Sequence, residues 1–340
     1  MRFSRSPKRV NMPQFLAESP PHEVCYFAIS PLMLFPGTCG DFCVYLLKRN
    51  DFVLFTRSGE RFTERHGKDL ADSNITEAYI RCDQEELYRQ YAEHHLGKIL
   101  SNDATPLKER AAIFHDTSVE IVRVAFEQRL PEALARTRNF QRIIEFVQET
   151  MQFLTTQESF RTIAQLVSHD YRTYSHCVHV FLYSAAILQT YNVDKETLIQ
   201  AGIGAMLHDV GKTLISHDIL SKTGALTLTE RRIIKTHPLK GVSLCTALPL
   251  SQTACNCILF HHEKLDGSGY PSRITKEDIP LSVRAIAIAD IYDAMTTNRP
   301  YSKAMNPFQV LRMMRDDMFH ELDMEMFKRF VTILSGAKVV

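Results

Sequence analysis

The chain has 340 residues, of which 45% are apolar and 23% are charged, and its formal net charge is +1. This length fits about two domains of ordinary size, and this composition supports packed cores rather than a disordered chain. A nearly neutral chain has no overall electrostatic attraction to a nucleic-acid polymer or to a membrane surface, so neither is expected as a partner.

The first ten residues are basic and lack the apolar stretch of a signal peptide. We expect residues 1–20 to form a disordered basic tail. No stretch reaches the ~18 apolar residues that a membrane span requires. No pair among the eight cysteines has the Cys-x-x-Cys spacing of a zinc or redox site. These features predict a cytosolic protein in which all eight cysteines are buried free thiols.

Residues 21–105 are expected to form a small α/β domain. Aromatic and β-branched runs at 42–47 and 52–56 flank a turn at 48–51, which is the pattern of a β-hairpin, and residues 78–80 predict a further strand. Asp83 and Glu86 have the spacing of a capping box, which predicts a helix over residues 84–100. We interpret this domain as regulatory or dimerising, and the sequence indicates no ligand for it.

Residues 106–156 have the apolar periodicity of two helices, interrupted near Pro131. Their apolar stripes are typical of a core or a dimer seam, and we interpret them as a helical linker. From residue 157 onward, long apolar segments alternate with short polar and glycine-containing breaks. This pattern predicts an all-helical bundle at residues 157–340.

Four His-Asp dipeptides occur in the chain, but only one has a setting that indicates chemistry. His208 and Asp209 follow an apolar helical segment and precede Val-Gly-Lys. Gly211 can end that helix, and Lys212 can then point into a site. We assign surface or capping roles to the other three dipeptides, which begin at His115, His169 and His217.

Two more clusters of polar residues interrupt apolar helical segments. His261 and His262 are adjacent, follow such a segment, and precede a loop with two glycines and a proline. Asp290 and Asp293 lie within another apolar segment, where an unpaired buried carboxylate would cost several kcal/mol. Each of these aspartates must therefore bind a metal or pair with another group, and a cap or a salt bridge is the alternative for Asp293.

In these motifs, residues 160–335 resemble the HD-GYP phosphodiesterases, a bacterial signalling branch of the HD metal-dependent phosphohydrolase superfamily. The motifs, in order, are HDVGK at 208–212, THP at 236–238, HHEKLDGSGYP at 261–271 and ADIYDAMTTNRPYS at 289–302. The resemblance implies a phosphodiesterase that hydrolyses a cyclic dinucleotide, with cyclic di-GMP foremost, to pGpG by means of a metal-bridging hydroxide. The implied fold class is mainly α, with a C-terminal all-helical HD-type bundle and a small N-terminal α/β domain.

The same resemblance assigns roles to individual residues. The implied metal ligands are His176, His208, Asp209, His237, His261, His262 and Asp290. Asp209 would bridge the metals, Lys212 and Arg299 would bind the substrate phosphates, and Tyr270 would lie beside the site. Asp209 and Lys212 are thus the expected catalytic residues. Five imidazoles and two carboxylates are too many for one ion and suit two divalent transition metals, with iron expected first, then manganese, then zinc.

Arg172 stands four residues before His176, where some members of the family have a glutamate that helps to hold a third metal. A guanidinium does not ligate a cation. We therefore expect two metals, and we expect Arg172 either to bind a substrate phosphate or to point to solvent.

Two alternative functions stay open from the sequence. One is an HD phosphohydrolase that acts on another nucleotide, and the other is a non-catalytic adaptor that binds a cyclic dinucleotide. The expected partners are cyclic di-GMP, other signalling proteins such as diguanylate cyclases, and a second copy of the chain in a homodimer.

Overall fold

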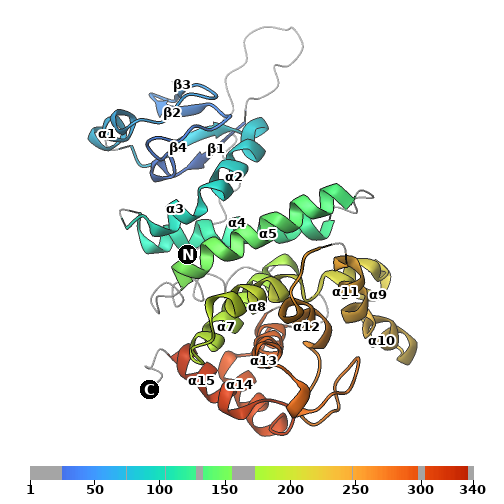
Figure 1. Cartoon of the computed structure of the whole chain (residues 1–340). Coiled ribbons are helices and arrows are strands. Elements are labelled where there is room, and N and C mark those ends of the chain that lie inside the picture. Colours follow the sequence, from blue (N-terminus) through green and yellow to red (C-terminus); the bar gives the residue numbers. More distant parts are fainter. Residues whose placement is uncertain are drawn as a thin grey trace. The chain divides into compact units, whose positions relative to one another are not determined.

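The computed structural model describes residues 25–73, 75–103, 105–127, 133–154, 173–246, 248–297 and 303–335. The chain divides into two compact units, Met1–Thr105 and Pro106–Val340. In the described ranges the fold is mainly helical, and the strands form one small sheet in the first unit (Figure 1), which confirms the predicted fold class. None of the helices in these ranges is both long enough and apolar enough to cross a membrane.

The first unit is built on a four-stranded antiparallel sheet with the strand order β1-β4-β2-β3. Its strands are β1 (Tyr26–Ile29), β2 (Val44–Lys48), β3 (Asp51–Thr56) and β4 (Ala78–Arg81). The turn between β2 and β3 consists of Arg49 and Asn50, whose φ angles are 50° and 72°. Positive φ at both positions suits a two-residue hairpin turn. The predicted hairpin and the predicted strand at 78–80 are therefore confirmed, whereas β1 was not predicted.

In the described residues of the first unit, three helices and two short 3-10 turns accompany the sheet. They are α1 (Glu64–Asp72), α2 (Glu85–His94), α3 (Leu96–Ser101), η1 (Pro31–Met33) and η2 (Cys82–Gln84). Tyr91 of α2 packs edge-to-face on the fully buried Phe42, with ring centroids 5.3 Å apart, and so ties α2 to the core of the unit. The helix predicted over 84–100 is divided into α2 and α3. The capping-box prediction is wrong, because Asp83 pairs with Arg81 at 2.6 Å and α2 has no side-chain cap.

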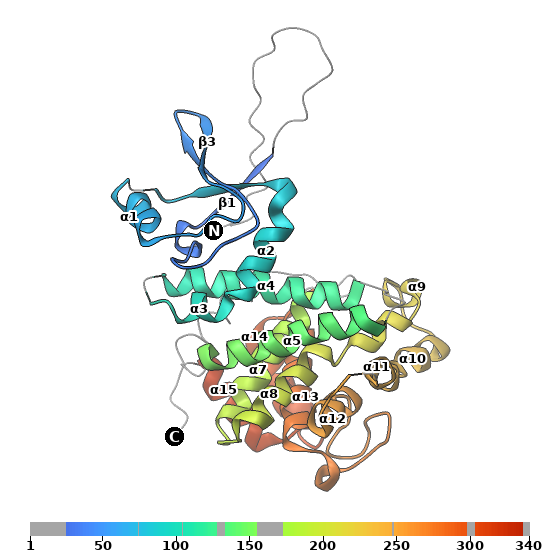
Figure 2. The same ribbon diagram turned by 45° about the horizontal axis from the view of Figure 1, so that its top comes forward.

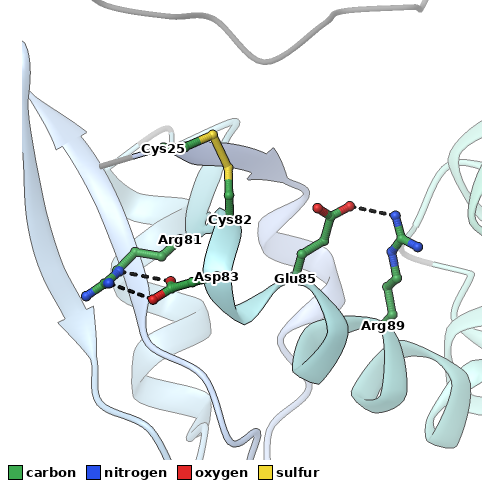
Figure 3. The surroundings of a disulfide bond; sticks show 6 residues. All are labelled: Cys25, Arg81, Cys82, Asp83, Glu85 and Arg89. Carbon is green, nitrogen blue, oxygen red and sulfur yellow. Dashed lines mark hydrogen bonds and ion pairs between the residues drawn. A yellow bond between two sulfur atoms is a disulfide. The ribbon is translucent and has the colours of Figure 1, made fainter. Parts of the chain in front are cut away.

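Cys25 and Cys82 form a disulfide between the residue before β1 and the residue after β4 (Figure 3). This bond contradicts the prediction that all eight cysteines are buried free thiols, and Cys39 is also exposed. The two bonded residues are 57 positions apart and meet only because β1 and β4 pair antiparallel. Disulfides are rare in reducing compartments, so the cysteines no longer support the cytosolic prediction.

Where the structure describes it, the second unit consists of helices. They are α4 (Leu107–Glu127), α5 (Ala133–Leu154), α7 (Thr173–Gln189), α8 (Lys195–Leu207), α9 (His217–Leu220), α10 (Leu228–Ile234), α11 (His237–Cys245), α12 (Gln252–Phe260), α13 (Leu281–Thr296), α14 (Pro307–Asp317) and α15 (Met324–Ser335), with 3-10 turns η3 (Val210–Leu214) and η4 (Lys276–Asp278). Helices α7, α8 and α13 lie centrally, with α11 and α12 on one side and α14 and α15 on the other (Figures 1 and 2). Helices α4 and α5, which the sequence assigns to a linker, pack on α7 and α8 within this unit.

The central helices are apolar around much of their circumference because other helices cover them on several sides. In α13, all residues from Ala285 to Asp290 are buried. A polar side chain in such a helix needs a partner, because an unpaired one would be costly. The aspartates of α13 and the histidines of α7 therefore need hydrogen-bond or ion-pair partners on neighbouring helices.

Phe181 provides a test of this packing. It is fully buried on α7, and its ring lies 6.2 Å from that of Phe146 on α5. We expect Phe181→Ala to lower the free energy of unfolding of the helical unit by about 3–5 kcal/mol, through lost burial and the cavity left behind. Phe308→Ala is the control, because Phe308 is 75% exposed, and it should change the free energy by less than about 0.5 kcal/mol. Urea unfolding followed by circular dichroism measures both, and equal midpoints would contradict the packing described.

Candidate metal centre

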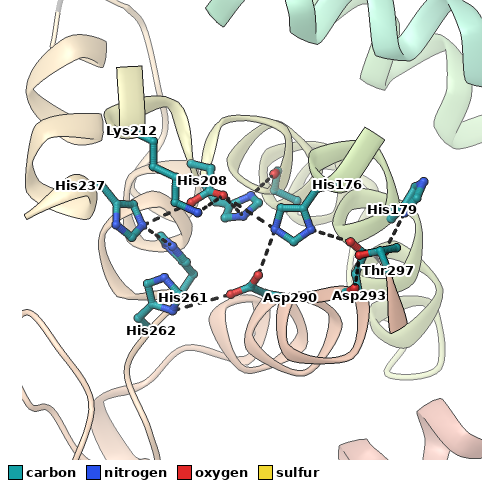
Figure 4. Close-up of polar contacts among 12 residues, drawn as sticks. His176, His179, His208, Lys212, His237, His261, His262, Asp290, Asp293 and Thr297 are labelled. Atoms are coloured by element: carbon teal, nitrogen blue, oxygen red, sulfur yellow. Dashed lines mark hydrogen bonds and ion pairs between the residues drawn. The ribbon is translucent and has the colours of Figure 1, made fainter. Parts of the chain in front are cut away.

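The seven ligand residues predicted from the sequence come from separate segments and lie together in the second unit (Figure 4). They are His176 on α7, His208 and Asp209 after α8, His237 at the start of α11, His261 and His262 after α12, and Asp290 on α13. Nε2 of His176 lies 3.1 Å from Oδ1 of Asp290, and Nε2 of His237 lies 3.3 Å from Oδ1 of Asp209. The predicted ligand set is therefore one spatial cluster.

Three of the histidines sit at helix ends and are oriented by the backbone. Nδ1 of His208, His237 and His261 lies 2.7, 2.9 and 2.9 Å, respectively, from the carbonyl oxygen three residues earlier. A carbonyl oxygen can only accept a hydrogen bond, so Nδ1 carries the proton in each ring. Each Nε2 then has a free lone pair, which is the form of imidazole that binds a metal.

The contact between His237 and His261 shows that this site suits a cation. Their Nε2 atoms lie 3.1 Å apart, and neither carries a proton in the tautomer fixed by the backbone. Two lone pairs at this distance repel each other unless a proton or a metal ion lies between them. Burial lowers the pKa of both imidazoles, which disfavours the proton. In the described part of the chain, Nε2 of His208 and Oδ1 of Asp209 are also buried without a hydrogen-bond partner.

The two carboxylates of the cluster are ionised although they are buried. Burial raises the pKa of Asp209, but Lys212, whose Nζ lies 2.6 Å from Oδ2, and His208 outweigh it and hold this pKa well below its usual range. For Asp290, burial likewise opposes the shift, and hydrogen bonding to His176 together with the nearby His262 lowers its pKa. The negative charges of these two carboxylates attract cations.

His176 differs from the other histidines of the cluster. Burial lowers its pKa, but hydrogen bonds to Asp290 and Asp293 more than offset this and raise it to about 9. In the metal-free protein its ring therefore holds a positive charge between carboxylates. A metal bound at Nε2 would replace that proton, as is usual when an imidazole becomes a ligand.

The chemistry of the donors fits a divalent transition metal. The cluster contains five imidazoles and two carboxylates, a set that suits iron, manganese or zinc rather than magnesium or calcium. No thiolate takes part: Cys177 follows His176 on α7, but burial raises the pKa of its thiol well above the usual value. The seven donors thus fit metal ions bound by nitrogen and oxygen.

The loop that follows the two adjacent histidines is fastened to the site. The ring of Tyr270 lies over His262 with the centroids 4.7 Å apart, and Nζ of Lys235 lies 4.9 Å from the Tyr270 ring centroid. Oε1 of Glu263 accepts hydrogen bonds from the backbone N–H groups of Ser272 and Arg273, at 2.6 and 2.9 Å. Glu263 is only 3% exposed. This role of Glu263 was not predicted from the sequence, although the glutamate of the HHE motif was an available signal for it.

Gly211 has a different role from the predicted one. Helix α8 ends at Leu207, four residues before Gly211. A Cβ atom at Gly211 would lie 1.9 Å from the carbonyl oxygen of His237, so glycine is required because η3 lies directly against the start of α11. This close approach sets the distance between the His208 segment and His237.

Other predicted residues have mixed outcomes. Asp293 pairs with His176 and with His179, so the salt-bridge alternative is confirmed. His179 was not predicted from the sequence. The surface or capping role is wrong for His115, which is 6% exposed and whose ring centroid lies 6.3 Å from that of His179. His217 is exposed at the start of α9, as predicted. The residues Arg172, Arg299 and His169 lie outside the described residues.

The comparisons with known proteins agree with this geometry. Residues 167–326 match the family model of the HD domain. A cyclic di-GMP phosphodiesterase of Pseudomonas aeruginosa is 34% identical over 171 residues, which is 50% of this chain and 41% of that protein. A 3'3'-cGAMP-specific phosphodiesterase of Vibrio cholerae is 34% identical over 155 residues, which is 46% of this chain and 34% of that protein. The chain thus spans less than half the length of these curated relatives.

Among solved structures, an HDG"Y"P protein from Bdellovibrio bacteriovorus has a similar fold, with a TM-score of 0.63 over 92% of this chain and 100% of that chain, at 19% sequence identity. Residues 167–326 form a domain that is similar to the HD domain. This domain carries the HDVGK, HHE and GYP motifs that are typical of the HD-GYP branch, so the resemblance drawn from the sequence is confirmed.

The role of Glu263 can be tested by removing its charge. We expect Glu263→Gln to weaken the two hydrogen bonds to the loop and to destabilise it by about 1–3 kcal/mol, because hydrogen bonds to a charged acceptor are the stronger ones. The backbone N–H groups of Ser272 and Arg273 should then exchange with solvent about tenfold faster or more, as measured by hydrogen exchange. Glu277→Gln, at an exposed position, is the control. Unchanged hydrogen exchange in Glu263→Gln would show that Glu263 does not hold the loop.

Proposed function

We propose that this chain is a metal-dependent phosphodiesterase that hydrolyses a cyclic dinucleotide, with cyclic di-GMP as its main substrate and linear pGpG as its main product. The observation that supports it most strongly is the buried cluster of five imidazoles and two carboxylates within an HD domain. Relatives named cyclic di-GMP phosphodiesterases favour that substrate. Relatives named 3'3'-cGAMP-specific phosphodiesterases make 3'3'-cGAMP the second candidate.

The proposed cofactors are two divalent metal ions, with iron first, then manganese, then zinc. His237, His261 and His262 would hold one ion, and His176, His208 and Asp290 the other, because the donor atoms within each group lie within 4.8 Å of one another. Two such ions can lower the pKa of a bound water and hold a phosphodiester in line for attack.

Asp209 lies between the two groups of ligands. Its Oδ1 is 3.3 Å from Nε2 of His237, and its Oδ2 is 3.5 Å from Nε2 of His208 and 3.7 Å from Nε2 of His176. One carboxylate oxygen thus faces each group. This placement favours Asp209 as the ligand shared by both ions.

The proposed role of Lys212 is to stabilise negative charge on the substrate phosphate. Its side chain is 30% exposed, and its Nζ lies beside Asp209, so a positive charge stands at the edge of the ligand cluster where a substrate can reach it. Fixed positive charge near a reacting phosphoryl group stabilises the transition state. Tyr270 and Arg299 remain proposed contacts to the substrate on the basis of the family resemblance. Arg172 is a proposed phosphate contact because its planar guanidinium suits one, and pointing to solvent is the alternative.

The remaining proposals concern the organisation of the whole protein. We propose a basic tail at residues 1–20, a regulatory unit at 21–105, a helical connection at 106–156 and the catalytic domain at 157–340. A cytosolic location, a homodimer and contacts with signalling proteins such as diguanylate cyclases are further proposals, which rest on the sequence without its cysteines.

The direct test uses protein purified without oxygen. We expect about two metal ions per chain, as two-metal phosphodiesterases require, and turnover of cyclic di-GMP to pGpG with slow or absent formation of GMP. Metals are measured by elemental analysis, and products by chromatography over time, with 3'3'-cGAMP assayed in parallel. Rapid formation of GMP would contradict the product assignment. No turnover of either dinucleotide by metal-loaded protein would overturn the function.

Two substitutions separate metal binding from substrate binding. Asp209→Ala should lose both ions, because it removes the shared ligand. Lys212→Met should retain them and lower kcat by about 10²–10³-fold, the usual effect of losing one group that stabilises transition-state charge. Lys276→Met, at an exposed position, is the control for removing a lysine. Loss of metals from Lys212→Met would show that Lys212 supports Asp209 rather than the substrate.

A further inference from the structure

Asp293 is a buried carboxylate next to the metal centre but outside its ligand set. Its side chain is 2% exposed, and it lies on α13 one helical turn after Asp290. Its Oδ2 accepts a hydrogen bond from Nδ1 of His176 at 2.6 Å, and its Oδ1 accepts one from Nδ1 of His179 at 2.6 Å (Figure 4). One carboxylate thus joins two imidazoles of α7, which share a helix face because they are three residues apart.

This contact distinguishes His176 from the histidines that the backbone orients. His208, His237 and His261 each donate from Nδ1 to a neutral carbonyl oxygen. His176 donates to a charged carboxylate, which can only accept, so a proton is fixed on Nδ1, and Nε2, the atom that a metal would bind, points toward Asp290 and the other ligands. A carboxylate behind a ligating histidine fixes the ring orientation and makes the imidazole a stronger ligand.

His179 does not belong to the ligand cluster. Its side chain is 1% exposed, and in the described part of the chain its Nε2 has no hydrogen-bond partner. Its one strong polar contact among those residues is the hydrogen bond to Asp293. With one imidazole on each oxygen, Asp293 is held on both sides.

We infer that Asp293 and His179 are positioning residues for the metal centre, with His179 holding Asp293 and Asp293 orienting His176 as a ligand. This inference rests on the proposed metal centre and goes beyond it, because neither residue belongs to the seven ligands. Losing such a partner of a metal-binding histidine lowers metal affinity by about 10–100-fold.

The test measures the binding of Mn²⁺ alone to the full chain, using the electron paramagnetic resonance signal of the free ion. We expect Asp293→Asn to weaken Mn²⁺ binding by about 10–100-fold. His179→Leu should weaken it in the same direction. The Mn²⁺ affinity of His179→Asn should stay close to that of the parent, because the amide nitrogen of Asn can replace Nδ1 as a hydrogen-bond donor. Asn and Leu have nearly the same size, so the two variants differ mainly in this hydrogen bond. The exposed Asp278→Asn is the control.

A double variant separates positioning from general loss of packing. If His179 acts through Asp293, the variant with both Asp293→Asn and His179→Leu should bind Mn²⁺ about as weakly as Asp293→Asn alone. Circular dichroism without metal checks that each variant is folded. If Asp293→Asn fails to fold, the comparison of His179→Leu with His179→Asn decides the inference.

Several outcomes would overturn this inference. Parent-like Mn²⁺ affinity in folded Asp293→Asn would do so while leaving the proposed function intact. An equal loss of affinity in His179→Asn and His179→Leu would indicate packing rather than hydrogen bonding. If the folded parent chain itself binds no Mn²⁺, iron or zinc, the proposed function fails, and the inference fails with it.

Discussion

The structure of the helical unit depends on placing seven polar donors in a mostly buried position between apolar helices. Such a cluster is costly unless each donor is oriented and partnered. The backbone orients and partners His208, His237 and His261, because the Nδ1 atom of each donates to a carbonyl oxygen three residues earlier. The remaining lone pairs and the two carboxylates then face one another, and a cation between them would relieve the repulsion.

The helices can come close enough to form this cluster because small residues stand where backbones meet. A side chain at Gly211 would collide with the backbone of His237, and one at Gly269 would collide with Glu263, whose Cα would lie 2.5 Å from the added Cβ. Glycine at these positions lets η3 lie against α11 and lets the loop fold back on the two adjacent histidines. The loop is then fixed by the carboxylate of Glu263. The geometry of the donors is thus set by backbone packing as much as by the donors themselves.

The first unit is stabilised by its own hydrophobic core and a disulfide. Its core combines aliphatic side chains with a few aromatic rings, and α2 closes it over a small antiparallel sheet. A disulfide ties the start of β1 to the end of β4, which reinforces a unit whose apolar core is small. This unit therefore has its own internal packing and is a compact module in its own right.

The sequence by itself determined the residue types of the site, the order of its motifs and the mainly helical class, because helix periodicity and the identity of metal-binding side chains are local properties. It also indicated the β2–β3 hairpin, since strands and tight turns leave a short-range pattern. Only the tertiary structure decided that Asp293 and His176, 117 residues apart, form a hydrogen bond, that Glu263 holds the loop, and that Cys25 bonds to Cys82. Periodicity predicts which face of a helix or strand is apolar. The faces that meet are decided by packing summed over the whole unit, and no single segment of the sequence contains that sum.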